Sequence, residues 1–306
     1  MAHGPDIDGV LIEWGDRLFY PGNRRVRSAE GLSPASRRRR AAAIRARIEA
    51  TVVRRATQVM VKVTGGGRGM KAIAAHFRYI SKNGRLSMED EREQLVSGSG
   101  SVREIADDWR YGGTLIEDES FRREAFNIIL SMPAGTNAEI VQKASREFAR
   151  QEFSDHKYVM VLHDHQANPH VHLSVRAESI RGWRLNPRKA DLRRWRETFA
   201  EKLRGWGVDA EASRQSSRGV ARRYPEIWQV KAEAEGRLRK TRSLKSRRVS
   251  SQHPAAKAWR QVSQALAASS SERDRALGRA VDGHLRDGFD PQALTPEVPR
   301  PVSRDR

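Results

Sequence analysis

Cysteine is absent from this chain of 306 residues. Its absence excludes disulfide bonds, cysteine-ligated zinc and thiol catalysis. The chain also lacks any apolar run near the roughly 18 residues of a membrane-spanning helix, and its first residues lack the apolar stretch of a signal peptide. We therefore expect a protein of the cytoplasm that does not insert into a membrane.

Acidic residues are scarce relative to basic ones. The chain has 58 Lys and Arg residues against 38 Asp and Glu residues, which gives a formal net charge of +20 and a pI of about 11.0. A balance this basic indicates a polyanionic partner, and nucleic acid is the leading candidate. Hydrophobic residues make up 38% of the chain, which is low for a fully packed protein, so part of the chain is expected to lie outside a core.

The composition divides the chain into three regions. Residues 1–56 form a basic N-terminal extension that includes four consecutive arginines, Arg37 to Arg40. Residues 57–212 carry the patterns of a folded domain. Residues 213–306 are polar and basic again; some helix is expected near residues 254–287, but we expect partial disorder rather than a compact core.

The middle region predicts an α+β domain. Apolar runs and alternation predict strands at residues 57–64, 124–133, 157–163 and 170–177. Apolar residues at helical spacing predict helices at residues 70–84, 136–153 and 188–207. The order of these elements favours a central antiparallel sheet flanked by helices.

Two connecting segments have little apolar content. The loop GGGRG, residues 65–69, lacks the Gly-Lys-Ser/Thr ending of a phosphate-binding P-loop. Residues 85–120 are polar and contain the run SGSGS, which predicts a flexible connection.

Four histidines lie within HDHQANPHVHL, residues 163–173. Alternate residues of a strand share a face, so His170 and His172 are expected to project side by side. The segment DHQANP is short enough for a hairpin loop, which would bring His163 beside them. Three neutral imidazoles would leave positions on a divalent ion open for a phosphate oxygen. An isolated His-x-His pair, by contrast, is more often a chance feature of a surface strand.

These residues resemble the third motif of conjugative relaxases, also called mobilisation nucleases: a His, then seven residues on a Pro-His-x-His. Such proteins belong to the HUH endonuclease superfamily, named for a His-hydrophobic-His pair. The resemblance implies an antiparallel sheet flanked by helices, with Mg²⁺ or Mn²⁺ held by His163, His170 and His172. Many relatives have Asp where this chain has His165, whereas the acid here is Asp164. Both residues are therefore candidates for a supporting role beside the ligand histidines.

The family uses a tyrosine as its nucleophile, which becomes linked to the 5′ phosphate of the nicked strand. Tyr79 lies in AIAAHFRYISKNGRL, which resembles the family's first motif, a helix with the pattern YI-x-K/R-x-G. Tyr111, in the loop WRYGG, stays open as an alternative. A tyrosine in a folded domain is most often a core residue. The presence of the three histidines nevertheless favours Tyr79 as the nucleophile.

Two further segments resemble family motifs. NIILSMPAGT resembles a strand that ends in Ser before a helix, which implies that Ser131 contacts DNA near the nick. GWRLNPRKADLRRWRETFAEKL resembles the helix that follows the third motif, and it implies phosphate contacts by Arg184 and Arg188, with Arg193 and Arg194. The resemblance covers about residues 57–210.

The resemblance implies a DNA relaxase that binds single-stranded and duplex DNA at the transfer origin of a plasmid or mobile element and nicks one strand for conjugative mobilisation. It also implies accessory relaxosome proteins, a type IV coupling protein, and export of this bacterial cytoplasmic protein with the DNA by type IV secretion. The end RPVSRDR fits an export signal or a disordered basic tail. Two alternatives stay open: a replication initiator or transposase with the same chemistry, and a non-catalytic nucleic-acid-binding protein with a structural metal site.

Overall fold

The computed structural model describes residues 6–19, 30–166, 168–221, 247–250 and 253–290. These residues fall into two compact units. The central unit comprises residues 56–212, and the terminal unit comprises the described parts of residues 1–55 and 213–306. The assignment of the two ends of the chain as separate regions remains a prediction.

A six-stranded antiparallel sheet forms the middle of the central unit, as predicted. Its strand order is β2-β5-β7-β6-β3-β4. The strands are β2 (Met60–Gly65), β3 (Met88–Asp90), β4 (Leu95–Val96), β5 (Ala125–Ser131), β6 (His156–His163) and β7 (His170–Ser179). At one end of the sheet, His170 pairs with Ser131 of β5 and with His163 of β6.

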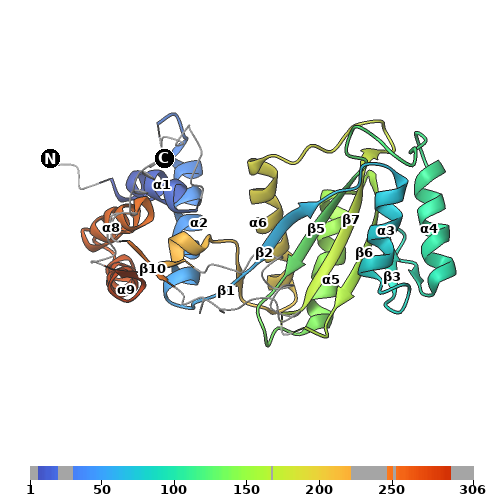
Figure 1. Ribbon diagram of the computed structural model, residues 1–306. Helices are drawn as coiled ribbons and strands as arrows, with labels where there is room; N and C mark the ends of the chain where they lie inside the picture. Colours follow the sequence, from blue (N-terminus) through green and yellow to red (C-terminus); the bar gives the residue numbers. More distant parts are fainter. Residues whose placement is uncertain (1–5, 20–29, 167, 222–246, 251–252, 291–306) are drawn as a thin grey trace, which may run out of the picture. The chain divides into compact units, whose positions relative to one another are not determined.

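Helices cover both faces of this sheet (Figure 1). The helices α5 (Ala138–Glu152) and α6 (Lys189–Gly205) pack on one face, against a core that includes Val171 and Leu173. The helices α3 (Met70–Ile80) and α4 (Ser99–Tyr111) cover the other face through a second core. The predicted α+β class is therefore confirmed. A short parallel pair, β1 (Thr57–Gln58) and β8 (Ala210–Glu211), lies outside the sheet.

The alternation in β7 determines which residues face which layer. Val171, Leu173 and Val175 point into the core beneath α5 and α6 and are at most 1% exposed. The intervening side chains, His170 and His172 among them, therefore lie on the face that α3 and α4 cover. One period-two pattern thus buries the apolar residues and places the histidines together.

Residues 85–120 were predicted to be a flexible connection, and that prediction was wrong. They contain β3, β4 and α4, and α4 begins at Ser99, inside the run SGSGS. The helix buries Val102, Ala106 and Trp109, which recur at helical spacing. The Trp109 ring packs edge-on against Phe77 of α3, with centroids 4.8 Å apart. Burial of these three side chains against a distant part of the chain thus stabilises the helix, although the composition of the segment is polar and rich in glycine.

The terminal unit has a compact core, contrary to the expectation from its composition. The core joins α1 (Ile7–Phe19), α2 (Pro34–Val52), α8 (Pro254–Ala267) and α9 (Glu272–Gly288). It includes Ile44, Ile48, Trp259 and Val281, each at most 3% exposed. The expectation was wrong because each end of the chain supplies only part of this core, and the parts meet only in the folded protein. The unit also contains η1 (Gln215–Arg218), β9 (Val220–Ala221), β10 (Arg247–Ser250) and β11 (Phe289–Asp290).

Arginines of α2 make ion pairs within the terminal unit. Arg40 forms an ion pair with buried Asp16, in which its Nη2 donates to both carboxylate oxygens, at 2.9 and 3.0 Å. Arg45 makes an ion pair with Asp274 of α9, at 2.8 and 2.9 Å, and also contacts Asp8. Much of the basic character of this helix therefore stabilises the unit itself.

Across the described residues, no helix combines the length and the apolar character needed to span a bilayer.

Candidate functional site

The hairpin of β6 and β7 brings three histidines together at one end of the sheet. His163 ends β6 directly opposite His170, and His172 follows two residues later on the same face. One ring nitrogen of each histidine lies within 4.8 Å of those of the other two. The closest rings, those of His163 and His172, have centroids 4.5 Å apart.

Backbone carbonyls orient two of these rings. The Nε2 atom of His163 lies 2.7 Å from the carbonyl oxygen of Ile80, and Nδ1 of His170 lies 2.9 Å from that of Asn168. A carbonyl oxygen only accepts, so each of these nitrogens donates, and the other nitrogen of each ring is left with a lone pair. Metal-binding histidines commonly have this arrangement, with one nitrogen on a carbonyl and the other on the ion.

The donor set fits a divalent cation. Three nitrogens that each lie about 2.1 Å from one ion are within roughly 4.2 Å of one another, so small side-chain rotations would bring these three rings to ligand distance. All three donors are imidazoles, and imidazole suits transition metals better than it suits Mg²⁺. His163, His170 and His172 could therefore hold the ion, with coordination positions left for an oxygen ligand.

Burial keeps two of these imidazoles neutral. It lowers the pKa of His172 from the ordinary 6.5 to about 3, with smaller contributions from the neighbouring His163, His170 and His76. Burial also lowers the pKa of His163, against the opposing effect of its bond to the Ile80 carbonyl. Metal binding requires neutral imidazole, so at neutral pH these two rings are already in the binding state.

Tyr79 lies beside this cluster, in the last turn of α3. Its side chain is 72% exposed, so it is not a core residue. The next residue, Ile80, supplies the carbonyl that accepts from His163, which fixes the end of α3 to the histidine cluster. Tyr111, the alternative nucleophile, is 70% exposed at the end of α4.

Two residues near the cluster were not predicted from the sequence as site residues. His76 is half-buried one turn before Tyr79 on α3, and its ring centroid lies 6.3 Å from that of Tyr79 and 6.4 Å from that of His172. Lys82 follows the helix in a left-handed conformation, φ +50°, and its charge is among the smaller influences that lower the pKa of His163. The i, i+3 spacing of His76 and Tyr79 on a predicted helix was the available signal.

Three other predicted residues lie near the cluster. Ser131 is buried, and its hydroxyl lies 3.4 Å from the carbonyl oxygen of Pro169, the residue before His170. Asp164 and His165 are exposed in the hairpin loop. The His165 ring centroid is 5.2 Å from that of His163, outside the set of three convergent nitrogens. Roles in DNA contact or ligand support remain predictions for all three.

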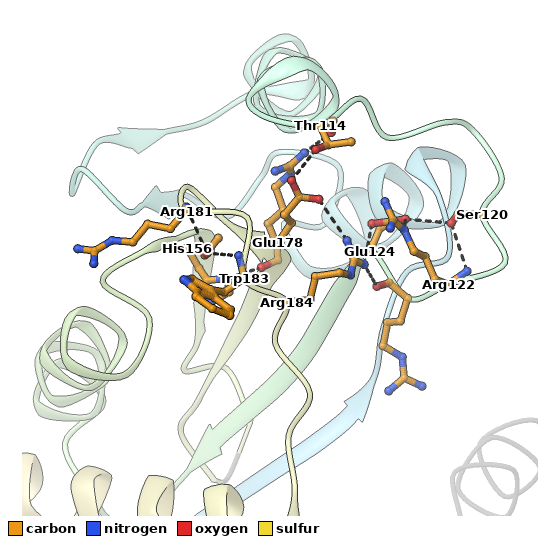
Figure 2. A network of polar contacts seen from close by, with 12 residues as sticks. Thr114, Ser120, Arg122, Glu124, His156, Glu178, Arg181, Trp183 and Arg184 are labelled. Atoms are coloured by element: carbon orange, nitrogen blue, oxygen red, sulfur yellow. Dashed lines mark hydrogen bonds and ion pairs between the residues drawn. The ribbon is translucent and has the colours of Figure 1, made fainter.

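The structure does not bring Arg184 to the histidines. Arg184 lies at the opposite end of the sheet, where it pairs with Glu124 at 3.0 Å and Glu178 at 3.3 Å (Figure 2). Glu124 also accepts from Arg122 at 2.7 Å. Burial raises the pKa of Glu124, but the hydrogen bonds from Arg122 and Arg184 outweigh it, and the net pKa is lowered. Arg188 is exposed before α6.

The antiparallel sheet carries a His-hydrophobic-His pair on a central strand and a third histidine on the adjacent strand, and an exposed tyrosine lies on a neighbouring helix. This arrangement is expected of the HUH nuclease class. Comparison with known proteins leads to the same class. Residues 79–208 match the family model described as Relaxase, MobA/VirD2-like, nuclease domain. Over these residues, the chain is similar to the nuclease domain of relaxases and mobilisation nucleases.

Three relatives are T-DNA border endonucleases named VirD2. Those of Rhizobium radiobacter, Agrobacterium fabrum and Rhizobium rhizogenes are 26%, 28% and 27% identical to this chain over 186 residues. Each match covers 54% of this chain, and it covers 44%, 42% and 43% of the respective relative. The chain thus matches less than half the length of these relatives.

Proposed function

We propose that this chain is a DNA relaxase that nicks one strand of a plasmid or mobile-element transfer origin and becomes covalently attached to it. The observation that carries the proposal is the convergence of His163, His170 and His172 beside Tyr79. The similarity of residues 79–208 to relaxase nuclease domains and the net charge of +20 support it. The name of the relatives, T-DNA border endonuclease, describes activity on DNA in those proteins.

In the proposed reaction, the Tyr79 hydroxyl oxygen attacks the scissile phosphorus and loses its proton. The bond between phosphorus and the 3′ oxygen breaks, and that oxygen takes up a proton to become a 3′ hydroxyl. The product is a 5′-phosphotyrosyl ester, which keeps a phosphodiester-like bond and allows the same site to reseal the strand.

The residues of the site have separate tasks. A phenol has a pKa of about 10 and is a weak nucleophile at neutral pH. A divalent ion bound by the three histidines would supply Lewis-acid stabilisation of the phenolate and of the charge that develops on the phosphate. The bond from His163 to the Ile80 carbonyl holds the helix end that carries the tyrosine. The His76 ring neighbours both the Tyr79 ring and the His172 ring.

The partners and setting extend the same proposal. The proposed substrate is single-stranded and duplex origin DNA, and the proposed cofactor is Mg²⁺ or Mn²⁺. The proposed partners are accessory relaxosome proteins and a type IV coupling protein. Nicking would take place in a bacterial cytoplasm. Export with the DNA would follow. The suggested export signal, RPVSRDR, lies outside the described residues, so its test is functional: deletion of residues 295–306 is expected to reduce transfer without reducing nicking.

The proposal is tested with oligonucleotides that tile a candidate transfer origin, incubated with Mn²⁺, Mg²⁺ or EDTA. The wild type and the matched control Tyr111→Phe are expected to form a covalent protein–DNA adduct when metal is present. Tyr79→Phe is expected to bind the same oligonucleotide without forming the adduct. An adduct with Tyr79→Phe would overturn the assignment of the nucleophile. No metal-dependent nicking by folded wild type would favour the non-catalytic alternative.

A further inference from the structure

A basic cavity lies at the end of the sheet away from the histidines. It has a volume of about 440 Å³, and four arginines line it: Arg68, Arg122, Arg123 and Arg184. Its apolar lining includes Val63, Phe126 and Leu192. Such a volume lies within the roughly 300–1,000 Å³ typical of sites for small molecules.

Strand register separates this cavity from the candidate nuclease site. On β5, Ser131 pairs with His170, whereas Phe126 pairs with Val175. Five residues of strand span about 17 Å, at ~3.3 Å per residue. An odd separation also puts Phe126 and Ser131 on opposite faces of the sheet. The cavity is therefore a separate feature and not an extension of the histidine cluster.

The glycine-rich loop that follows β2 places Arg68 at this cavity. A Cβ on Gly66 would lie 2.1 Å from the carbonyl oxygen of Ala125. Gly69 has φ +93°, and a Cβ there would lie 2.3 Å from the carbonyl oxygen of Asp118. The backbone of this loop therefore packs closely against residues 118–125, and Arg68 carries the only side chain in GGGRG. The loop is not a P-loop; it presents a single arginine.

The four arginines divide into two kinds. Arg122 and Arg184 both pair with the buried carboxylate of Glu124, and Arg184 also pairs with Glu178, so two carboxylates balance the charge of these two arginines (Figure 2). Arg184 also donates to the carbonyl oxygen of Arg123, at 2.8 Å, which fixes the backbone there. The exposed Arg123 guanidinium lies 5.1 Å from the Phe126 ring centroid, above the apolar floor. Arg68 and Arg123 thus give the cavity its excess positive charge.

We propose that this cavity binds one nucleotide of single-stranded DNA, with its base against the floor formed by Val63, Phe126 and Leu192 and its phosphate at Arg68 and Arg123. Guanidinium groups match phosphate oxygens in geometry, and bases stack on apolar and aromatic surfaces without sequence preference. The choice of DNA as ligand rests on the proposed function. The cavity is then a second anchor, on the opposite face of the sheet and about 17 Å along β5 from the end that carries the histidines.

The first test measures binding without cleavage. Full-length Tyr79→Phe protein in EDTA is titrated into a fluorescent oligonucleotide at several salt concentrations. Adding Arg68→Ala and Arg123→Ala is expected to weaken binding about tenfold and to reduce the salt slope by about 0.7, because both arginines contact one phosphate and each phosphate contact on a single strand contributes about 0.7. The control carries Arg92→Ala and Arg103→Ala, two exposed arginines elsewhere in the unit, and should weaken binding less than about twofold. Equal losses in both double variants would overturn the proposal.

The second test locates the base. An oligonucleotide with 5-iododeoxyuridine is photocrosslinked to Tyr79→Phe protein and digested with trypsin. Crosslinking is expected in the peptide of residues 124–143, which contains Phe126, and Leu192→Trp, which fills the cavity, is expected to abolish it. Crosslinks confined to other peptides would contradict the proposal. Displacement of the crosslink by free thymidine monophosphate as effectively as by an unlabelled strand would overturn the assignment to a strand. Neither test requires nicking. Failure of the proposed function is therefore detected separately, in the cleavage assay, where wild-type protein would leave origin DNA uncut in Mn²⁺.

Discussion

Replacing His172 with Gln tests whether the candidate ligands are buried as neutral imidazoles. The folded pKa of His172 is about 3, against an ordinary 6.5. Between these values the unfolded chain binds a proton that the folded chain does not, so stability is lost as the pH falls. From pH 7 to pH 5, the unfolded chain takes up most of one proton at this position. At about 1.4 kcal/mol per pKa unit, the loss is on the order of 2 kcal/mol for this residue alone.

Urea unfolding of metal-free protein at the two pH values measures this loss. Between pH 7 and pH 5, the free energy of unfolding should decrease in both proteins. The decrease should be smaller in His172→Gln than in the wild type, by on the order of 2 kcal/mol. The matched control is His165→Gln, which changes an exposed histidine of the same hairpin and should follow the wild type. If His172→Gln loses as much stability as the wild type on acidification, the burial argument for the site is refuted.

Three further predictions concern the metal, the glycine loop and the terminal unit. His170→Ala is expected to weaken Mn²⁺ binding about 100-fold or more in calorimetry, and wild-type affinity in this variant would contradict the ligand set. Gly69→Ala should lower the free energy of unfolding by roughly 2 kcal/mol, because alanine is strained at φ +93° and its Cβ meets Asp118; an unchanged urea midpoint would contradict this. Asp274→Asn should destabilise the terminal unit by about 2 kcal/mol through its charged bonds to Arg45, and unaltered hydrogen exchange in α2 and α9 would contradict it.

Local patterns were sufficient to predict the strands β2, β5, β6 and β7 and the helices α3, α5 and α6 of the central unit. The period-two run of β7 and the short connection before it predicted that His163, His170 and His172 would share a face, since strand geometry and hairpin length are set by neighbouring residues. The helix pattern that ends at Tyr79 predicted α3 for the same reason. These elements needed no information about distant contacts.

What sequence reasoning missed depends on contacts between distant residues. The ion pair of Arg184 with Glu124 joins residues 60 positions apart, so no local pattern indicated this pairing. Helix α4 is stabilised by Phe77, which lies on another helix. The terminal unit pairs Ile48 near one end of the chain with Trp259 near the other. In each case, the partner that stabilises the residue lies too far along the chain for a local pattern to reveal.

Mass mapping of the DNA-linked peptide tests the central claim most directly. Wild-type protein is incubated with an origin oligonucleotide and Mn²⁺, the adduct is digested with trypsin, and the nucleotide-bearing peptide is sequenced. The predicted peptide is Tyr79–Lys82, which follows Arg78, with the added mass on Tyr79. A nucleotide on the peptide that begins at Tyr111, or a nicked strand with no linked peptide, would contradict the account.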